Sequence, residues 1–271
     1  MPAVRVRQEE LAGRPLLVRE ADATAAGPVV YLHGVPTSSA DWVPFLERTG
    51  GVAPDLPGFG RSGKRASDPY TIAGYDGWIE GFLEHRGIGS FALVVHDWGA
   101  VGLLTAMRMP ERVSRLVVLS AVPLLPGHTW HRIARAWRTR VVGELVMGAV
   151  SRRTLSILTR GAVAAPGPLP AGMLDRMAED FDQGTQRAIL SLYRSAPPAA
   201  LERAGRGLGA LDCPALVLWG DRDPYLPARF AEGYAAALGG PAEVHHLEDA
   251  GHWPWLDRPD VVDTVAGFLG A

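Results

Sequence analysis

The stretch that decides the fold of this 271-residue chain reads Phe91-Ala92-Leu93-Val94-Val95-His96-Asp97-Trp98-Gly99-Ala100. An apolar run rich in β-branched residues ends abruptly near Asp97, and a helix-compatible segment follows from Ala100 to Met109. This order predicts a buried strand, a sharp turn and a helix. Such a turn raises one side chain above the carboxyl end of a parallel sheet, and here that side chain belongs to Asp97.

A carboxylate at this turn restricts the chemistry that the site can perform. A serine must lose a proton before it attacks, whereas an aspartate is already an anion at neutral pH. The anion suits displacement at a saturated carbon, which gives an ester between enzyme and substrate that water must then cleave. The turn therefore indicates an enzyme with Asp97 as its nucleophile.

Apolar runs on both sides of this stretch extend the predicted sheet. The expected strands comprise a hairpin of residues 4–7 and 15–19 and the segments 28–32, 51–55, 115–120, 214–219 and 243–247. Helices are predicted between several of these strands, among them residues 72–85, and a terminal helix covers 260–269. Strands that alternate with helices and lack period-two polarity are typical of an α/β fold with a mostly parallel sheet covered on both faces.

The alternation stops at Pro123 and resumes after about Leu208. Between them we predict helices over residues 128–141, 173–181 and 185–193, with Thr185 as the N-cap of the last. A proline-rich loop at 164–170 separates them, because no helix can cross it. We therefore interpret residues 1–122 and 209–271 as a core domain and residues 123–208 as a helical cap inserted in it.

Composition narrows the class of protein. A hydrophobic content of 47% is enough for a sizeable core, and a formal net charge of −2 gives no basic footprint for nucleic acid. No apolar run approaches the roughly 18 residues that span a bilayer, and the amino terminus lacks the apolar core of a signal peptide. We expect a cytoplasmic protein that binds a small apolar substrate and neither nucleic acid nor membrane, with a homodimer left open.

An aspartate nucleophile needs a base to activate water, a carboxylate to orient that base, and donors for an oxyanion. His252, in the loop after the last predicted strand, is the candidate base. Asp223, just after the preceding strand, is the candidate orienting acid, with Asp221 as its competitor. The backbone N–H groups of Val35 and Trp98 are the candidate oxyanion hole.

Five motifs carry a resemblance to the α/β-hydrolase superfamily over nearly the whole chain. In chain order they are His33-Gly34-Val35-Pro36, the turn-rich segment 55–62, His96-Asp97-Trp98-Gly99, Gly220-Asp221-Arg222-Asp223 and Gly251-His252. The first and third resemble the branch that holds epoxide hydrolases and haloalkane dehalogenases. The spacing in this family favours Asp223 over Asp221. The resemblance implies that Asp97 attacks an sp3 carbon and that His252, held by Asp223, activates water, with no metal or organic cofactor.

Both reactions of this branch share these groups, so the group that stabilises the leaving atom must distinguish them. Epoxide hydrolases of the branch resemble each other in two cap tyrosines, the second in a Tyr-Arg context. Tyr193, followed by Arg194, fits that context and is the only tyrosine of the cap. The first tyrosine is missing, and Trp130 or His131 is the candidate replacement donor.

Haloalkane dehalogenases of the branch resemble this chain at Trp98, whose indole N–H would bind the leaving halide. Tryptophan is also common at this position in epoxide hydrolases, so Trp98 by itself separates the two reactions poorly. Val35 stands where one large subgroup has a second donor, an asparagine, whereas Trp130 and Trp137 keep a cap tryptophan available. With His131, these three tryptophans are the candidate substrate-binding residues. We predict an epoxide hydrolase, with haloalkane dehalogenation as the first alternative and a non-catalytic ligand-binding relative as an alternative of another class.

Overall fold

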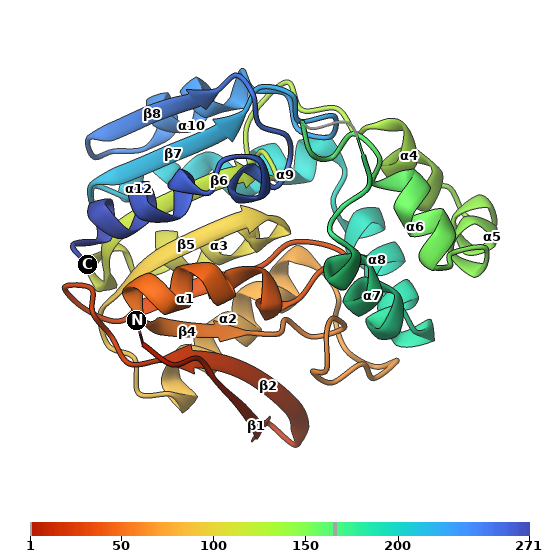
Figure 1. Ribbon diagram of the computed structural model, residues 1–271, viewed down its shortest axis with the longest axis horizontal. Helices are drawn as coiled ribbons and strands as arrows, with labels where there is room; N and C mark the ends of the chain where they lie inside the picture. Colours follow the sequence, from red (N-terminus) through yellow and green to blue (C-terminus); the bar gives the residue numbers. More distant parts are fainter. Residues whose placement is uncertain (1, 165–166) are drawn as a thin grey trace.

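An eight-stranded sheet runs through the computed structural model, which describes residues 2–164 and 167–271 (Figure 1). Its spatial order is β1-β2-β4-β3-β5-β6-β7-β8. The strands are β1 (Arg5–Leu11), β2 (Arg14–Ala21), β3 (Val29–Leu32), β4 (Gly51–Pro54), β5 (Phe91–Asp97), β6 (Val113–Ala121), β7 (Ala215–Gly220) and β8 (Ala242–Leu247). β2 is antiparallel to β1 and to β4, and every other neighbouring pair is parallel. The predicted α/β fold with a mostly parallel sheet is confirmed.

Helices cover both faces of the sheet, which explains why its central strands are apolar throughout. Successive side chains of a strand point to opposite faces, and every residue of β5 is buried. Leu93 and Val95 pack into a core with α2 (Ile72–His85), α3 (Gly102–Arg108) and α10 (Phe230–Ala237). Ala92 and Val94 pack into a second core with α1 (Val43–Thr49) and α12 (Asp260–Leu269).

Among the described residues, six α-helices connect β6 to β7, and Figure 1 shows α4 to α8 beyond the carboxyl ends of the strands. They are α4 (Arg132–Arg138), α5 (Val142–Gly148), α6 (Arg152–Leu158), α7 (Ala171–Asp180), α8 (Gln183–Ser195) and α9 (Pro198–Ala204). They occupy the segment that we assigned to the cap, and the described residues of that segment include no strand. In the described part of the chain, no helix combines the length and the apolar character needed to cross a membrane.

Two details of the predicted cap are wrong. The helix expected over residues 128–141 is shorter, because α4 begins only at Arg132 and ends at Arg138, where Thr139 adopts an extended conformation with ψ 120°. A separate helix, α5, begins after Val141, which has a positive φ of 69°. The N-cap of α8 is Asp182 instead of Thr185, and the Asp182 side chain accepts the backbone N–H of Thr185. A carboxylate at that position satisfies a donor that the first helical turn leaves free.

The turn after β5 has the strained geometry that its sequence predicts. Asp97 lies at φ 48° and ψ −120°, outside the backbone regions that residues other than glycine prefer. Two glycines allow this turn to sit close to its neighbours. A Cβ on Gly99 would overlap the backbone oxygen of Leu32, and one on Gly34 would lie 2.5 Å from Asp97 Oδ1. Gly34 and Gly99 are thus needed because their backbones lie too close to neighbouring atoms for a side chain to fit.

Replacing Gly99 by alanine should lower the free energy of unfolding by about 3 kcal/mol, because the new methyl group collides with backbone that has no room to retreat. Urea denaturation followed by circular dichroism measures this change. The matched control is Gly77→Ala in α2, where a Cβ meets no atom within 4 Å. That control should be neutral or should stabilise the protein by up to about 1 kcal/mol. Equal losses in both variants would contradict the proposed crowding of the turn.

Candidate active site

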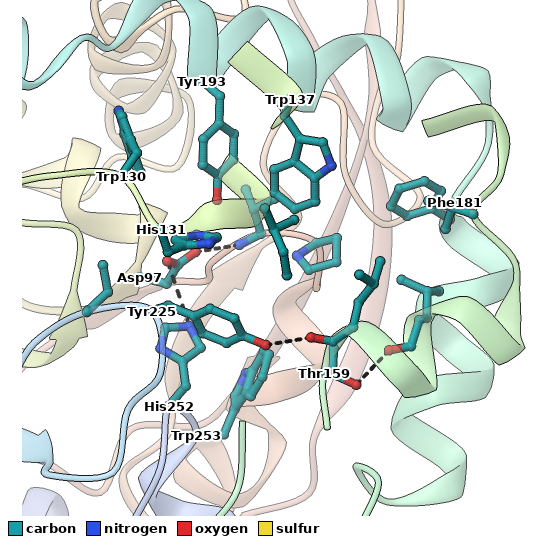
Figure 2. A pocket seen from close by; sticks show the side chains of 17 residues that line it. Asp97, Trp130, His131, Trp137, Thr159, Phe181, Tyr193, Tyr225, His252 and Trp253 are labelled. Atoms are coloured by element: carbon teal, nitrogen blue, oxygen red, sulfur yellow. Dashed lines mark hydrogen bonds and ion pairs between the residues drawn. The ribbon is translucent and has the colours of Figure 1, made fainter. Parts of the chain in front are cut away.

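Asp97, His252 and Asp223 meet at the carboxyl edge of the sheet, as the sequence predicts. Asp97 ends β5, Asp223 follows β7, and His252 follows β8. His252 Nδ1 lies 2.7 Å from Asp223 Oδ2, and His252 Nε2 lies 3.7 Å from Asp97 Oδ2. All three side chains are buried. The histidine therefore bridges the two carboxylates, and Figure 2 shows it beside Asp97.

The bonds of Asp223 fix which nitrogen of His252 faces Asp97. Asp223 Oδ1 accepts the backbone N–H groups of Tyr225 and Leu226, at 2.8 and 3.0 Å. Its other oxygen accepts the Nδ1–H of His252, so Nε2 is left toward Asp97. Asp221, the competitor in the sequence, instead pairs with His246 Nδ1 at 2.6 Å. Asp223, and not Asp221, is thus the carboxylate that lies against His252.

Three hydrogen bonds hold the loop that carries His252. His252 N–H donates to the Ala162 carbonyl at 2.7 Å, and its own carbonyl accepts His96 Nε2–H at 2.8 Å. Gly251 N–H donates to Asp257. His96 immediately precedes Asp97, so the nucleophile strand itself holds the loop of the candidate base.

Backbone donors face the carboxylate of Asp97 where the oxyanion hole was predicted. Val35 N–H donates to Asp97 Oδ1 at 2.8 Å, and the N–H of Trp98 also hydrogen-bonds this carboxyl group. Burial raises the pKa of Asp97, while the positive charge of protonated His252 and these two N–H groups act to lower it. Burial alone would lower the pKa of His252, but Asp223 and Asp97 together raise it above its ordinary value.

A cavity lies over Asp97, between the sheet and the cap. Apolar side chains dominate its wall, namely Val35, Pro36, Ile133, Val150, Leu155, Leu158, Phe181 and Leu226. The predicted cap residues Trp130, His131, Trp137 and Tyr193 also line it. Met173, Met177 and Leu192, by contrast, pack into the cores.

The polar atoms of these cap residues point in different directions. The Tyr193 hydroxyl is directed toward Asp97 in Figure 2. The Trp130 indole N–H donates to the Ala196 carbonyl at 2.9 Å and is therefore occupied. The Trp137 indole nitrogen has no hydrogen-bond partner among the described residues, and in Figure 2 it lies on the side of the ring facing Phe181.

Trp98 differs from its prediction as a residue of the pocket wall. Its side chain is buried, with the ring stacked on Trp130 at 5.4 Å and against the edge of Tyr193 at 5.1 Å. The ring is covered because the turn after Asp97 folds it under the cap. Its indole N–H makes no well-aligned hydrogen bond among the described residues, but it lies beside the Tyr193 hydroxyl and acts to lower the pKa of that group.

His131 presents a donor to the cavity. The backbone N–H of Ala134 donates to His131 Nδ1 at 3.4 Å, which caps α4. Burial, and next the charge of nearby His252, lower the pKa of His131 to about 4. The ring is thus neutral at pH 7, and since Nδ1 accepts, its proton resides on Nε2.

Tyr225 lines the cavity although sequence reasoning did not identify it. Its ring contacts His252 edge-on at 5.1 Å, and its hydroxyl donates to the Leu158 carbonyl of the cap at 3.1 Å. The available signal was its position two residues after Asp223, but loop position alone does not tell which way a side chain turns. Within the described residues, no cluster of three or more His, Cys, Asp or Glu side chains is arranged to hold a metal ion.

Changing Asp223 to asparagine should lower the pKa of His252, because the imidazolium loses the partner that raises its pKa most. Histidine resonances followed by NMR through a pH titration measure the shift. Asp221→Asn is the matched control. It should leave His252 in place and lower the pKa of His246, which Asp221 and Glu232 hold above its ordinary value. A lowered His252 pKa in the Asp221 variant would contradict the assignment of the acid.

Comparisons with known proteins place this geometry in a family. The model of the alpha/beta hydrolase family matches residues 29–265. A haloalkane dehalogenase from Mycobacterium marinum is 32% identical over 89% of this chain and 84% of its own length. A haloalkane dehalogenase from Mycolicibacterium paratuberculosis is 30% identical over 90% of this chain and 84% of its own length. The crystal structure of haloalkane dehalogenase DbeA from Bradyrhizobium elkani matches with a TM-score of 0.85 and 25% identity, over 98% of each chain. The chain therefore belongs to the α/β-hydrolase family, in the branch whose nucleophile is an aspartate.

Proposed function

We propose that this enzyme is a haloalkane dehalogenase acting on small apolar haloalkanes. The Asp97 carboxylate attacks the halogen-bearing carbon, and the halide leaves with the bonding electron pair. The result is an alkyl ester on Asp97. His252 Nε2 then takes a proton from water as the water oxygen attacks the ester carbonyl carbon. The Val35 and Trp98 backbone N–H groups stabilise the oxyanion, after which the alcohol departs and Asp97 is regenerated.

The observation that carries this proposal is the similarity to haloalkane dehalogenases, at 30% and 32% identity over about nine-tenths of this chain. The buried indole N–H of Trp98, one residue from Asp97 and beside the Tyr193 hydroxyl, is the candidate halide donor. A halide is a weak base that needs hydrogen-bond donors in a dry site and no proton. The Tyr193 hydroxyl, whose ring lies against Trp98, would be the second donor. The haloalkane dehalogenases among the relatives support this activity better than the epoxide hydrolysis that the sequence analysis placed first.

Epoxide hydrolysis is the second candidate, and the direction of the Tyr193 hydroxyl favours it. When Asp97 attacks an epoxide carbon, the C–O bond breaks and its electron pair goes to the oxygen, so the resulting alkoxide needs a proton. Burial first, and then the negative charge of Asp97, raise the pKa of Tyr193 well above its ordinary value, so the phenol stays protonated. His131 Nε2–H would be the second donor, in place of the missing cap tyrosine.

A His252→Gln variant should accumulate the ester, because alkylation needs only Asp97 whereas hydrolysis needs the base. After incubation with a 1-bromoalkane, intact-mass spectrometry should show a gain equal to the alkyl group less one hydrogen, located on the peptide that contains Asp97. Turnover should fall about 10²- to 10⁴-fold. Asp97→Asn should gain no mass, and His246→Gln, which changes an exposed histidine outside the cavity, should behave as wild type. Alkylation on another residue would contradict the assigned nucleophile.

The two candidate leaving groups can be separated with Trp98→Phe and Tyr193→Phe. For a dehalogenase, wild type releases bromide from bromoalkanes, and Trp98→Phe should reduce kcat/KM about 10²-fold by removing an N–H donor. For an epoxide hydrolase, aryl and alkyl epoxides become diols, and Tyr193→Phe is the damaging change. Diol formation without bromide release would replace the first proposal by the second. A wild-type protein that turns over neither class would contradict both.

A further inference from the structure

Exposed apolar side chains of this protein are concentrated at one place in the cap. The large hydrophobic residues exposed to solvent in the described chain are Val6, Val141, Val142, Leu145 and Ile157. Val6 lies on β1, and the other four lie beside or within α5 and α6. Leu145 and Val141 are one helical turn apart and are 71% and 69% exposed. Single exposed hydrophobic residues are ordinary, but a gathering of them marks a surface that another phase or partner covers.

The same part of the chain is strongly basic. We define the cap tip as residues 132–160, which span α4, α5 and α6. It contains seven arginines and one acidic residue, Glu144, a net charge of +6 in a chain whose total is −2. Glu144 is itself paired with Arg194 of α8. Among the described residues, no acid lies within ion-pair distance of Arg140, Arg153 or Arg160.

The cap tip is also the outer wall of the substrate cavity. Val150, Leu155 and Leu158 line the cavity from inside, while Leu145 and Ile157 of the same two-helix segment face solvent. In Figure 1, α5 forms the edge of the molecule farthest from both chain termini. A shallow hollow at this edge is lined by Val141, Leu145 and Arg140 together with the Glu144–Arg194 pair.

We propose that the cap tip docks reversibly on the surface of an anionic lipid bilayer. Apolar side chains that insert at the headgroup level, surrounded by unpaired arginines, are the two signals that such interfacial binding combines. A second copy of the chain would oppose one +6 surface to another and is disfavoured by charge. Nucleic acid would leave Val141 and Leu145 without an apolar environment. This proposal differs from the expectation, drawn from the lack of a spanning apolar run, that the protein binds no membrane, because peripheral docking needs no spanning helix. It does not depend on which leaving group the active site accepts.

Vesicle co-sedimentation tests the proposal directly. Wild-type protein should sediment with vesicles of mixed phosphatidylglycerol and phosphatidylcholine at low ionic strength, less at high salt, and weakly with phosphatidylcholine alone. Leu145→Glu should lower the affinity for the mixed vesicles at least about tenfold, since it removes an inserted side chain and adds a repelled charge. A double Arg140→Glu and Arg153→Glu variant should remove most of the salt-dependent binding.

Val6→Glu is the matched control, because it makes the same change at the exposed hydrophobic residue outside the cap tip. Its vesicle affinity should stay within about twofold of wild type. Circular dichroism melting checks that every variant is folded. The proposal is overturned by equal losses in Val6→Glu and Leu145→Glu, or by wild-type protein that does not distinguish anionic from neutral vesicles. A solution dimer that Leu145→Glu disperses, seen by analytical ultracentrifugation, would identify a second copy as the occupant instead.

Discussion

The strained backbone of Asp97 is the constraint on which the site depends. A non-glycine residue at φ 48° costs on the order of 1–3 kcal/mol, and it persists only where the surroundings leave no alternative. Here β5 is buried on both faces, and Asp97 O accepts Val122 N–H at 2.9 Å. Gly34 packs against the Asp97 side chain, so the contact that holds the carboxylate also brings Val35 N–H onto its oxygen. Nucleophile and oxyanion donor are therefore positioned by a single packing arrangement.

The base depends on the same strand. Parallel strands bring their carboxyl ends to one edge, which places the loops after β7 and β8 beside the turn at Asp97. His96 Nε2–H binds the backbone oxygen of His252, and its ring lies 4.7 Å from the His252 ring. Burial lowers the pKa of His96 well below its ordinary value, so it serves as a neutral donor beside a histidine that its carboxylates hold at a raised pKa. The lowered pKa of His96 thus keeps that ring neutral as a hydrogen-bond donor, whereas the raised pKa of His252 favours its binding a proton.

The sheet and the meeting of Asp97, Asp223 and His252 could be predicted because their signals are local in sequence and their positions follow from topology. An apolar run gives a strand, and the end of each strand gives a place at one edge. The cap offers no such rule. Periodicity continues from His128 to Val141 without proline or glycine between residues 128 and 141, yet the helix breaks before Val141. Arg138, the last residue of α4, donates to the Tyr193 and Ala196 carbonyls. The spacing of apolar residues in the sequence does not predict this tertiary contact. The burial of Trp98 and the inward turn of Tyr225 are likewise products of packing.

Strand ends can be predicted from sequence and cap packing cannot. For this reason the sequence indicates the type of reaction more firmly than it indicates the leaving group. Asp97, His252 and Asp223 serve any substrate with an electrophilic sp3 carbon, and all three come from strand ends. In the proposed reactions the leaving atom would instead depend on donors of the cap side of the site, Tyr193 and His131 in the cavity wall and Trp98 buried behind Tyr193, which differ in acidity and direction. An indole N–H can stabilise a halide but does not release its proton, whereas a phenol can do both. Because Tyr193 lies edge-on to Trp98, a leaving group that reaches one donor also approaches the other. On the proposed function, the preferred leaving group would therefore depend on which of these two adjacent donors the departing atom approaches more closely.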